Sequence, residues 1–311
     1  MPEAPHTVEL RVGGDVFGGF IRGRVRQSLE QLATTFSLTY SDRWAEDQEP
    51  LPIEEGDECA LLVDGEVLVE GYVDEAASRY DARKWDLSVS GRSRLGDLVD
   101  CAAQHRGSQW LRARLDEILE DLTGPFSVRA RVVGDPGPRF RRFKFEPGET
   151  ASEVISRAAR LRGRVPVDIG GELELVQVEE VEHTDTLRRG DPILRAERTG
   201  SWSERFSHYE FKGQTQADDE LNGVSAAQLR GMVEDRQVRR YRPTVVLSGG
   251  QDGDNDLGRR AILERNRRAG RGERITCTVP GFRNGAGDLW RPAQAVRLED
   301  DWLRVEAVLL V

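Results

Sequence analysis

The sequence is poor in cysteine and has no long apolar run, and each absence argues against a class of protein. The three cysteines, Cys59, Cys101 and Cys277, stand far apart in the 311 residues and form no CxxC pair. This spacing argues against a disulfide framework or a structural zinc, and it favours a reducing compartment. No stretch approaches the roughly 18 apolar residues of a transmembrane helix, and the N-terminus lacks a secretory signal. We therefore expect no membrane insertion.

Signatures of catalysis are also missing. The four histidines belong to no HExxH or other metal-ligand pair; they are His6, His105, His183 and His208. The segment "GVSAA" at Gly223 lacks the second glycine of a nucleophile elbow. The sequence contains no phosphate loop and no dinucleotide fingerprint. We predict that the chain is not an enzyme and holds no cofactor.

The charge balance is acidic. The chain has 45 Lys and Arg against 55 Asp and Glu, a net charge of −10. A protein that binds nucleic acid over its whole surface is normally basic, so we do not expect this one to be of that kind. Its length is typical of two or three domains.

The first 94 residues have the pattern of a β-rich unit. Polar and apolar residues alternate in "TVELRV" and "FSLTYS", and "ECALLVDGEVLVEGYVD" predicts a hairpin with a tight turn at Asp64-Gly65. We assign residues 1–94 to an N-terminal β-barrel module.

Residues 95–190 have a mixed pattern and are assigned to an α/β domain. A short helix is expected after Arg94. A longer one is expected over the segment "QWLRARLDEILEDLTGP", with one apolar stripe formed by Leu111, Leu115, Ile118, Leu119 and Leu122. Thr150 and Glu153 form a capping box for a third helix. A hairpin that turns at Gly170-Gly171 follows.

The rest of the chain returns to strands. We assign 191–216 plus 275–311 to a second β-barrel module. Residues 217–274 form an insertion whose arginine-rich helix is expected to pack with the α/β domain. Ala60–Val73 and Ala295–Val308 align without gaps, each with a strand, an acidic turn and a second strand. Chance similarity of two acidic hairpins is the alternative to a duplication. The predicted fold class is α+β, with two related antiparallel β-barrel modules and an inserted mixed α/β domain.

Three alternating aspartates, Asp252, Asp254 and Asp256, suggest a calcium loop, but the spacing does not fit. An EF-hand needs glycine at position 6 and a bidentate carboxylate at position 12. Counted from Asp252, glycine falls at position 7 and Glu264 at position 13. We reject a metal site here and expect Asp256 to cap a helix that begins near Leu257.

Two basic segments could bind phosphates, but both have a structural explanation. The helix after the aspartates is arginine-rich, yet it is interrupted by Glu264 and offers little aromatic surface for stacking. In "PRFRRFKF", at residues 138–145, Phe143 and Phe145 alternate with Lys144 as in a strand that buries one face. A nucleic-acid-binding protein is therefore one alternative function, and a cell-wall hydrolase is another.

Five segments occur in an order that resembles the baseplate hub proteins of phage Mu and Mu-like prophages. They are "LVDCAAQHRGSQW", "RFSHYEFKG", "VRRYRPTVV", "RAILERNRR" and "DLWRPAQAV". The resemblance implies a homotrimeric ring in a contractile-tail baseplate, with two barrel domains per subunit that imitate the six-fold tube. The implied partners are tail tube, spike and baseplate wedge proteins, with DNA only passing through the channel. The implied location is the virion tail baseplate, assembled in the host bacterial cytoplasm.

The resemblance also suggests where interfaces lie. The acidic turns are expected to be exposed hairpin tips, and the arginine cluster is expected to face neighbouring subunits, which leaves the channel wall acidic or neutral. The candidate interface residues are Asp64, Gly65, Glu66, Glu299, Asp300, Asp301, Arg260, Arg267 and Arg268. The chain ends inside an apolar strand at Val311, whereas family members continue further, so we expect a shortened C-terminus.

Overall fold

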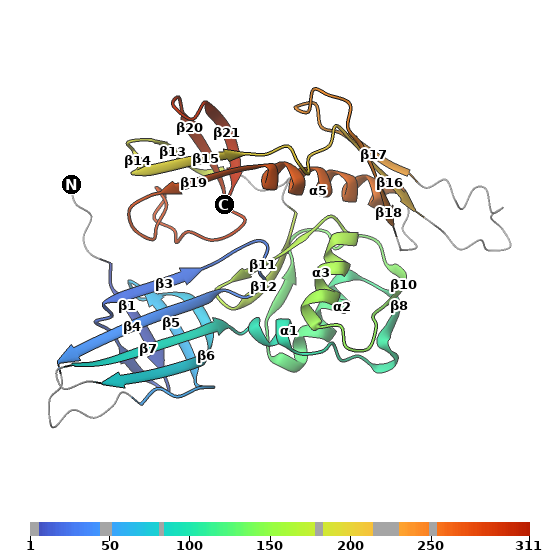
Figure 1. Cartoon of the computed structure of the whole chain (residues 1–311). Helices are drawn as coiled ribbons and strands as arrows, with labels where there is room; N and C mark the ends of the chain where they lie inside the picture. Colours follow the sequence, from blue (N-terminus) through green and yellow to red (C-terminus); the bar gives the residue numbers. More distant parts are fainter. Residues whose placement is uncertain (1–5, 44–51, 81–83, 178–182, 214–229, 249–253) are drawn as a thin grey trace.

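The computed structural model describes residues 6–43, 52–80, 84–177, 183–213, 230–248 and 254–311, and the statements below refer to these residues. Figure 1 shows a β-rich N-terminal part and a mixed α/β middle part side by side, with an elongated C-terminal part lying along both. Each part has a hydrophobic cluster of its own, and the C-terminal part has two.

The N-terminal part is one antiparallel sheet that curls into half a barrel. The sheet order is β2-β1-β5-β6-β7-β4-β3. Its strands are β1 (Val8–Val12), β2 (Asp15–Phe17), β3 (Arg22–Arg26), β4 (Thr35–Arg43), β5 (Glu58–Val63), β6 (Glu66–Tyr80) and β7 (Lys84–Ser93). The alternation predicted for these strands places Leu10, Leu38 and Leu61 in the interior. The predicted hairpin turn is confirmed: Asp64 and Gly65 have φ angles of 52° and 80°, as a two-residue hairpin loop requires.

The middle part combines three α-helices with two small sheets, β10-β8 and β11-β12-β9. Its elements are α1 (Gly96–Asp100), η1 (Arg106–Ser108), β8 (Gln109–Ala113), α2 (Leu115–Thr123), η2 (Gly124–Phe126), β9 (Ala130–Val132), β10 (Phe140–Lys144), α3 (Ala151–Leu161), β11 (Val165–Ile169) and β12 (Glu172–Val176). The capping box before α3 is confirmed: the Thr150 hydroxyl accepts from the Glu153 amide at 3.3 Å, and the Glu153 carboxylate accepts from the Thr150 amide at 2.8 Å. The predicted hairpin at Gly170-Gly171 is also present.

One helix prediction in this part was wrong at its start. The segment from Gln109 to Ala113 is strand β8, and helix α2 begins only at Leu115, so Leu111 is 66% exposed instead of lying on the apolar stripe. The strand forms because β8 pairs with β10 and buries Trp110 against Phe143 and Phe145. Packing with residues more than thirty positions away thus overrides the local helical pattern.

The C-terminal part contains three sheets, β14-β13-β20-β21, β15-β19 and β17-β16-β18. Its elements are β13 (His183–Arg189), β14 (Pro192–Ile193), β15 (Arg195–Gly200), β16 (His208–Gly213), β17 (Arg230–Glu234), β18 (Pro243–Ser248), α5 (Asp254–Gly272), β19 (Glu273–Thr278), β20 (Ala295–Asp300) and β21 (Val305–Leu310). Figure 1 shows two lobes, with the β20–β21 hairpin on one and β17 on the other.

Helix α5 covers one face of the β17-β16-β18 sheet. Leu257 and Ala261 of the helix pack on Phe211, and the close approach depends on Gly231 in β17. A Cβ atom at Gly231 would lie 2.4 Å from the carbonyl carbon of Leu257. The helix begins at Asp254, before the position near Leu257 that the sequence predicts, so Asp256 lies in its first turn and is not the residue that precedes it.

The two similar hairpins differ in detail. In β5–β6 a two-residue turn joins Val63 to Glu66, whereas in β20–β21 Glu299 and Asp300 still belong to the strand and the turn begins at Asp301. The expected acidic turn at Glu299–Asp301 is therefore displaced by two residues, because β20 pairs with β21 as far as Asp300 and Val305. The second β-rich part is not purely antiparallel as expected, because β13 pairs in parallel with β14 and β20, and β16 with β18. A common origin of the two β-rich parts, like the domain limits, stays a prediction.

Candidate interaction surfaces

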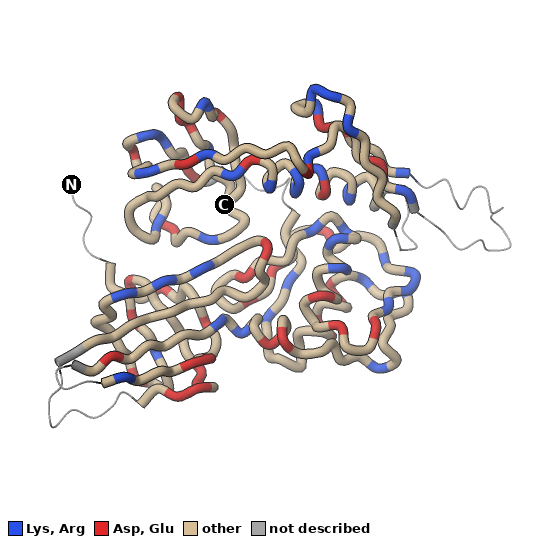
Figure 2. Tube along the Cα trace, viewed as in Figure 1, with Lys and Arg blue, Asp and Glu red and all other residues tan. Residues whose placement is uncertain are grey.

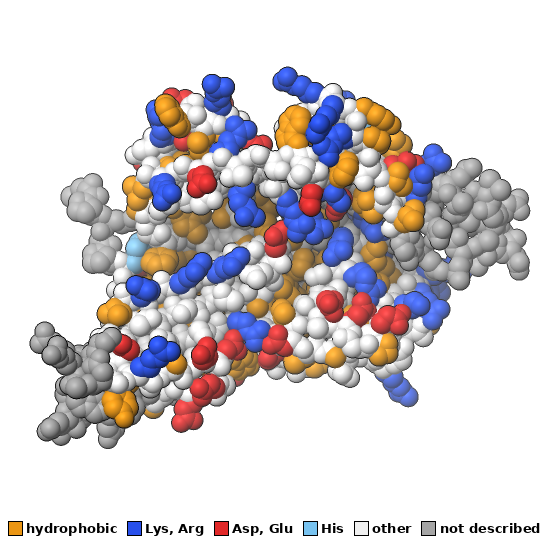
Figure 3. All heavy atoms as spheres, viewed as in Figure 1, with side chains coloured by type: hydrophobic (Ala, Val, Ile, Leu, Met, Phe, Trp, Pro, Cys, Tyr) orange, Lys and Arg blue, Asp and Glu red, His pale blue; other side chains and the backbone are white. Residues whose placement is uncertain are grey.

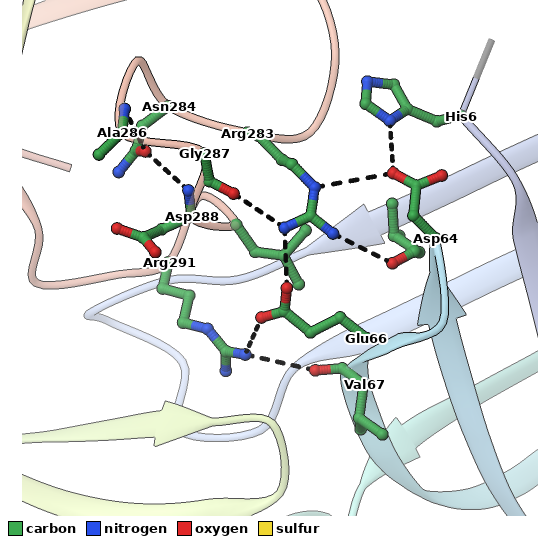
Figure 4. Close-up of polar contacts among 12 residues, drawn as sticks. His6, Asp64, Glu66, Val67, Arg283, Asn284, Ala286, Gly287, Asp288 and Arg291 are labelled. Carbon is green, nitrogen blue, oxygen red and sulfur yellow. Dashed lines mark hydrogen bonds and ion pairs between the residues drawn. The ribbon is translucent and has the colours of Figure 1, made fainter. Parts of the chain in front are cut away.

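The β5–β6 turn is joined to the loop after β19 by a cluster of ion pairs (Figure 4). The Arg283 guanidinium lies 2.8 Å from a Glu66 carboxylate oxygen and 3.6 Å from Asp64, and Arg291 lies 3.6 Å from the other Glu66 oxygen. His6 donates to Asp64 at 2.7 Å. This hydrogen bond, together with one from the Thr7 amide, lowers the pKa of Asp64.

The loop that carries Arg283 is held in shape by its own hydrogen bonds. The Asn284 side-chain oxygen accepts from the amides of Ala286 and Asp288, and the Gly287 carbonyl accepts from Arg283 at 2.9 Å. Asp64 and Glu66, which the sequence suggested as interface residues, therefore join the N-terminal sheet to the C-terminal part of the same chain. Their contact with another protein stays a prediction.

The acids of the β20–β21 hairpin have three different environments. Glu299 accepts from Arg297 and Arg188, which lower its pKa. Asp300 is buried and accepts from the Leu303 amide at 2.9 Å. Asp301 is exposed and lies 3.3 Å from Arg189. Only Asp301 of these three lies at the hairpin tip.

Sequence reasoning missed the most exposed large apolar side chain in the described part of the chain. Trp302, beside Asp301 at this tip, is 79% exposed. The available signal was an aromatic residue inside an acidic turn, where a solvated polar side chain is normal. Tryptophan is enriched among the residues that other proteins cover in interfaces.

The arginines of α5 are largely engaged within the chain. Arg260 lies over the Phe211 ring and Arg268 over the Phe206 ring, with guanidinium-to-centroid distances of 5.6 and 5.1 Å. Glu264 lies 2.6 Å from Arg268 and 3.6 Å from Arg267. Further contacts reach the other parts: Arg271 lies 2.7 Å from Glu30, and Arg259 packs on Gly163 beside α3. The contact of Arg260, Arg267 or Arg268 with a neighbouring subunit stays a prediction.

The aromatic residues of the 138–145 segment have a structural role. In the 138–145 segment Phe143 and Phe145 are buried, as the alternation predicts; Phe140 is buried as well, and Arg162 covers it at 3.6 Å. No ring there is free for a nucleotide base.

Figure 2 shows Lys and Arg along β3 and α5. The exposed arginines of β3 stand on the edge strand of its sheet, where charge discourages uncontrolled strand pairing.

The rejected calcium loop is only partly described by the structure. Asp252 lies outside the described residues, as do the side chains of Asp254 and Asp256. Within the described residues no group of three or more His, Cys, Asp and Glu side chains could hold a metal ion. None of the helices that the structure describes is both long and apolar enough to cross a membrane.

The face of the β17-β16-β18 sheet opposite α5 exposes apolar side chains. Met232 and Leu247 are 67% and 74% exposed, and Val245 and Tyr241 are exposed as well. Figure 3 shows hydrophobic side chains on the lobe that carries β17. Apolar residues gathered on one uncovered face are typical of a protein interface.

Comparison with known proteins gives the family. Residues 7–93 match the model for the N-terminal domain of Mu phage baseplate assembly protein GpP-like, and residues 95–177 match the second domain of baseplate hub protein gp44-like. The chain is 29% identical over 302 residues to baseplate hub protein gp44 of Escherichia phage Mu, which covers 94% of this chain and 79% of that protein.

Solved structures agree over nearly the whole chain. The 43 kDa tail protein of prophage MuSo2 from Shewanella oneidensis is 28% identical, with a TM-score of 0.83 over 98% of this chain and 92% of that one. A tail protein from Neisseria meningitidis shares the fold at 22% identity, with a TM-score of 0.81 over 99% of this chain and 90% of that one. Sequence and fold together place this chain in the family of the baseplate hub proteins of phage Mu and Mu-like prophages.

Proposed function

We propose that three copies of this chain form a ring at the centre of a contractile-tail baseplate. The ring joins the six-fold tail tube to the three-fold spike and leaves a channel through which DNA passes. The carrying observation is the likeness to Mu-type hub proteins along nearly the full chain, in both sequence and fold. The role is structural and not catalytic, and it is exercised in the virion after assembly in the host cytoplasm.

Symmetry explains why such a subunit needs two β-rich parts. A six-fold tube that rests on three subunits must find six docking surfaces, so each subunit has to supply two of them. This chain has a curled sheet at its N-terminal end and a second group of sheets at its C-terminal end. Three copies would therefore present six β-rich surfaces on one face, to which the tube protein docks, while spike and wedge proteins take other faces.

Exposed features of the described residues support assembly with other chains. The strands β3 and β21 each end a sheet, with one side unpaired. The apolar residues around Met232 and the indole of Trp302 are exposed in the single chain. Burial of such surfaces is the main favourable contribution to association.

The proposal is tested by the mass of the assembly in solution. Light scattering over a range of protein concentrations should reveal a species of three times the 34.9 kDa chain mass. Electron micrographs of that species should show a three-fold ring with an open bore whose wall is neutral or acidic. A chain that stays monomeric at every concentration, both alone and with its tube and spike partners, would contradict the ring.

A further inference from the structure

A groove in the C-terminal part has the size of a pocket for an aromatic side chain, and its lining combines charged and polar residues with a few apolar ones. It has a volume of about 760 Å³ and lies between β17 and the second half of α5. Helix and strand touch at Gly231 and Leu257, but farther along they leave this space between them. Among the described strands β17 pairs only with β16, so its other side borders the groove. The volume falls within the range of ligand pockets, roughly 300–1,000 Å³.

The groove offers what an indole requires. Val233 and Ala269 supply apolar surface, and the side chain of Arg236 is 92% exposed at the mouth. The amide oxygen of Gln237 accepts from Arg205 and can accept a second hydrogen bond. An inserted indole would pack on this apolar surface, donate its N–H to the Gln237 amide oxygen and stack beneath a guanidinium.

The floor of the groove is fixed before anything binds. Arg205 and Asp235, which are 5% and 6% exposed, form two hydrogen bonds of 2.6 and 3.2 Å, and Arg205 also donates to Gln237. This network holds the chain that follows β17 in place. A preformed pocket loses little conformational entropy when a side chain enters it.

The chain itself carries a side chain that matches this groove. Trp302 at the tip of the β20–β21 hairpin is exposed, with Asp301 directly before it and Arg304 two residues after it. Glu234 and Arg236 line the groove. Asp301 of the tip can therefore pair with Arg236, and Arg304 can pair with Glu234. Figure 1 places hairpin and β17 on separate lobes, so the tip of one copy does not lie in its own groove.

We propose that Trp302 of one copy inserts into the groove beside Met232 of the next copy and forms an anchor of the hub ring. Tip and groove are different surfaces of one chain, so their contact is heterologous, and three such contacts close a three-fold ring. This inference rests on the proposed function, because it names the contact that would hold that ring together. A central aromatic residue in a pocket is a common source of binding energy in protein interfaces.

Disulfide crosslinking tests the contact directly. The variant would carry Trp302→Cys and Gln237→Cys, together with Cys101→Ser and Cys277→Ser, and would keep the buried Cys59. Mild oxidation of the assembled protein should yield a covalent trimer on a non-reducing gel, because each ring closes three disulfides. Mixing one chain that carries only Trp302→Cys with another that carries only Gln237→Cys should yield a mixed dimer. The control pair is Trp302→Cys with Tyr80→Cys, an exposed residue of the N-terminal sheet, and it should not crosslink.

Each outcome of the crosslinking separates the contact from the ring. A trimeric mass without the 302–237 disulfide overturns the Trp302 contact and leaves the ring proposal in place. A covalent ladder beyond three chains indicates an open filament, and a disulfide within one chain shows that the tip reaches its own groove; both contradict the inference. A strictly monomeric protein contradicts the ring and the contact together.

Two further variants check that the effect belongs to the interface and not to the fold. Trp302→Ala should weaken trimer formation on the order of tenfold or more, as for an interface hot spot, with the thermal unfolding of the monomer unchanged. Asp301→Arg should weaken it as well, and the addition of Arg236→Asp should restore part of the loss. Equal trimer dissociation constants for the wild type and Trp302→Ala would contradict the proposal.

Discussion

At the scale of single residues, the buried pair of Arg205 and Asp235 is the contact most sensitive to change. Both side chains lie away from water and share two hydrogen bonds. Removal of one partner leaves the other charge buried and uncompensated, which costs more than the pair contributes. The pair could not be predicted from the sequence, because its members are thirty residues apart and belong to no motif.

We therefore expect Asp235→Ala to lower the free energy of unfolding by about 3–5 kcal/mol. Glu234→Ala is the matched control, since the neighbouring carboxylate is exposed and its loss should change the free energy of unfolding by less than about 0.5 kcal/mol. Urea unfolding followed by circular dichroism measures both values. Equal losses in the two variants would show that the buried pair has no special role.

The cysteines give a second prediction at this scale. Burial raises the pKa of the Cys59 thiol to about 12, whereas Cys101 is exposed. A thiol-specific reagent at neutral pH should label Cys101 in the folded protein quickly and leave Cys59 unlabelled.

Cys59 stays protonated in the folded state while the unfolded thiol ionises near pH 8.5, so the free energy of unfolding should fall as the pH rises above that value. Cys59→Ala should remove this part of the pH dependence; an unchanged profile would contradict it.

At the scale of elements, the sequence predicted those structures that depend on neighbouring residues. The Asp64-Gly65 turn and the Thr150–Glu153 capping box require only local chemistry, and both are present. The segment 109–113 was misassigned because its strand depends on β10, which lies about thirty residues away. The turn of β20–β21 was misplaced for a similar reason, since the pairing of β20 with β21 sets where that strand ends.

The packing of α5 on β17 gives a prediction with a built-in control. Gly231→Ala places a Cβ atom 2.4 Å from the backbone of Leu257, so the helix must shift, and we expect a loss of about 1–3 kcal/mol in the free energy of unfolding. Gly258→Ala makes the same chemical change in the facing helix, with nothing within 4 Å of the new atom. It should instead stabilise the protein by up to about 1 kcal/mol through helix propensity. Thermal unfolding distinguishes these opposite signs, and a loss in both variants would contradict the account.

At the scale of the whole molecule, the parts are joined by polar contacts and by the apolar side chain of Leu289, which is buried in the cluster of the N-terminal sheet. Arg283 and Arg291 tie the C-terminal part to the β5–β6 turn, and Arg271 ties it to Glu30. These pairs link residues more than two hundred positions apart, which is why the sequence suggested exposed tips where the structure has a joint. The order of strand-rich and mixed segments could be predicted from hydrophobic periodicity, but their mutual placement could not.

This joint should respond to charge and pH without loss of the cores. In Arg283→Ala/Arg291→Ala, amide hydrogen exchange in the β5–β6 turn and in the loop around Gly287 should accelerate by roughly two- to fivefold, the factor expected for solvent-screened pairs. Arg129→Ala removes an ion pair with Glu172 inside the middle part and should leave the exchange rates of both segments unchanged.

The pKa of Asp64 is lowered in the folded state. The stabilisation that its carboxylate gives the joint is therefore present above the unfolded pKa of about 3.9 and is lost as the pH falls through the lower folded pKa. Acidification below that point should therefore accelerate exchange in the same two segments of the wild type, before it does so in the interior of the curled sheet. Acceleration that begins in the sheet interior would show that the cores, and not this joint, are the first part of the molecule to open.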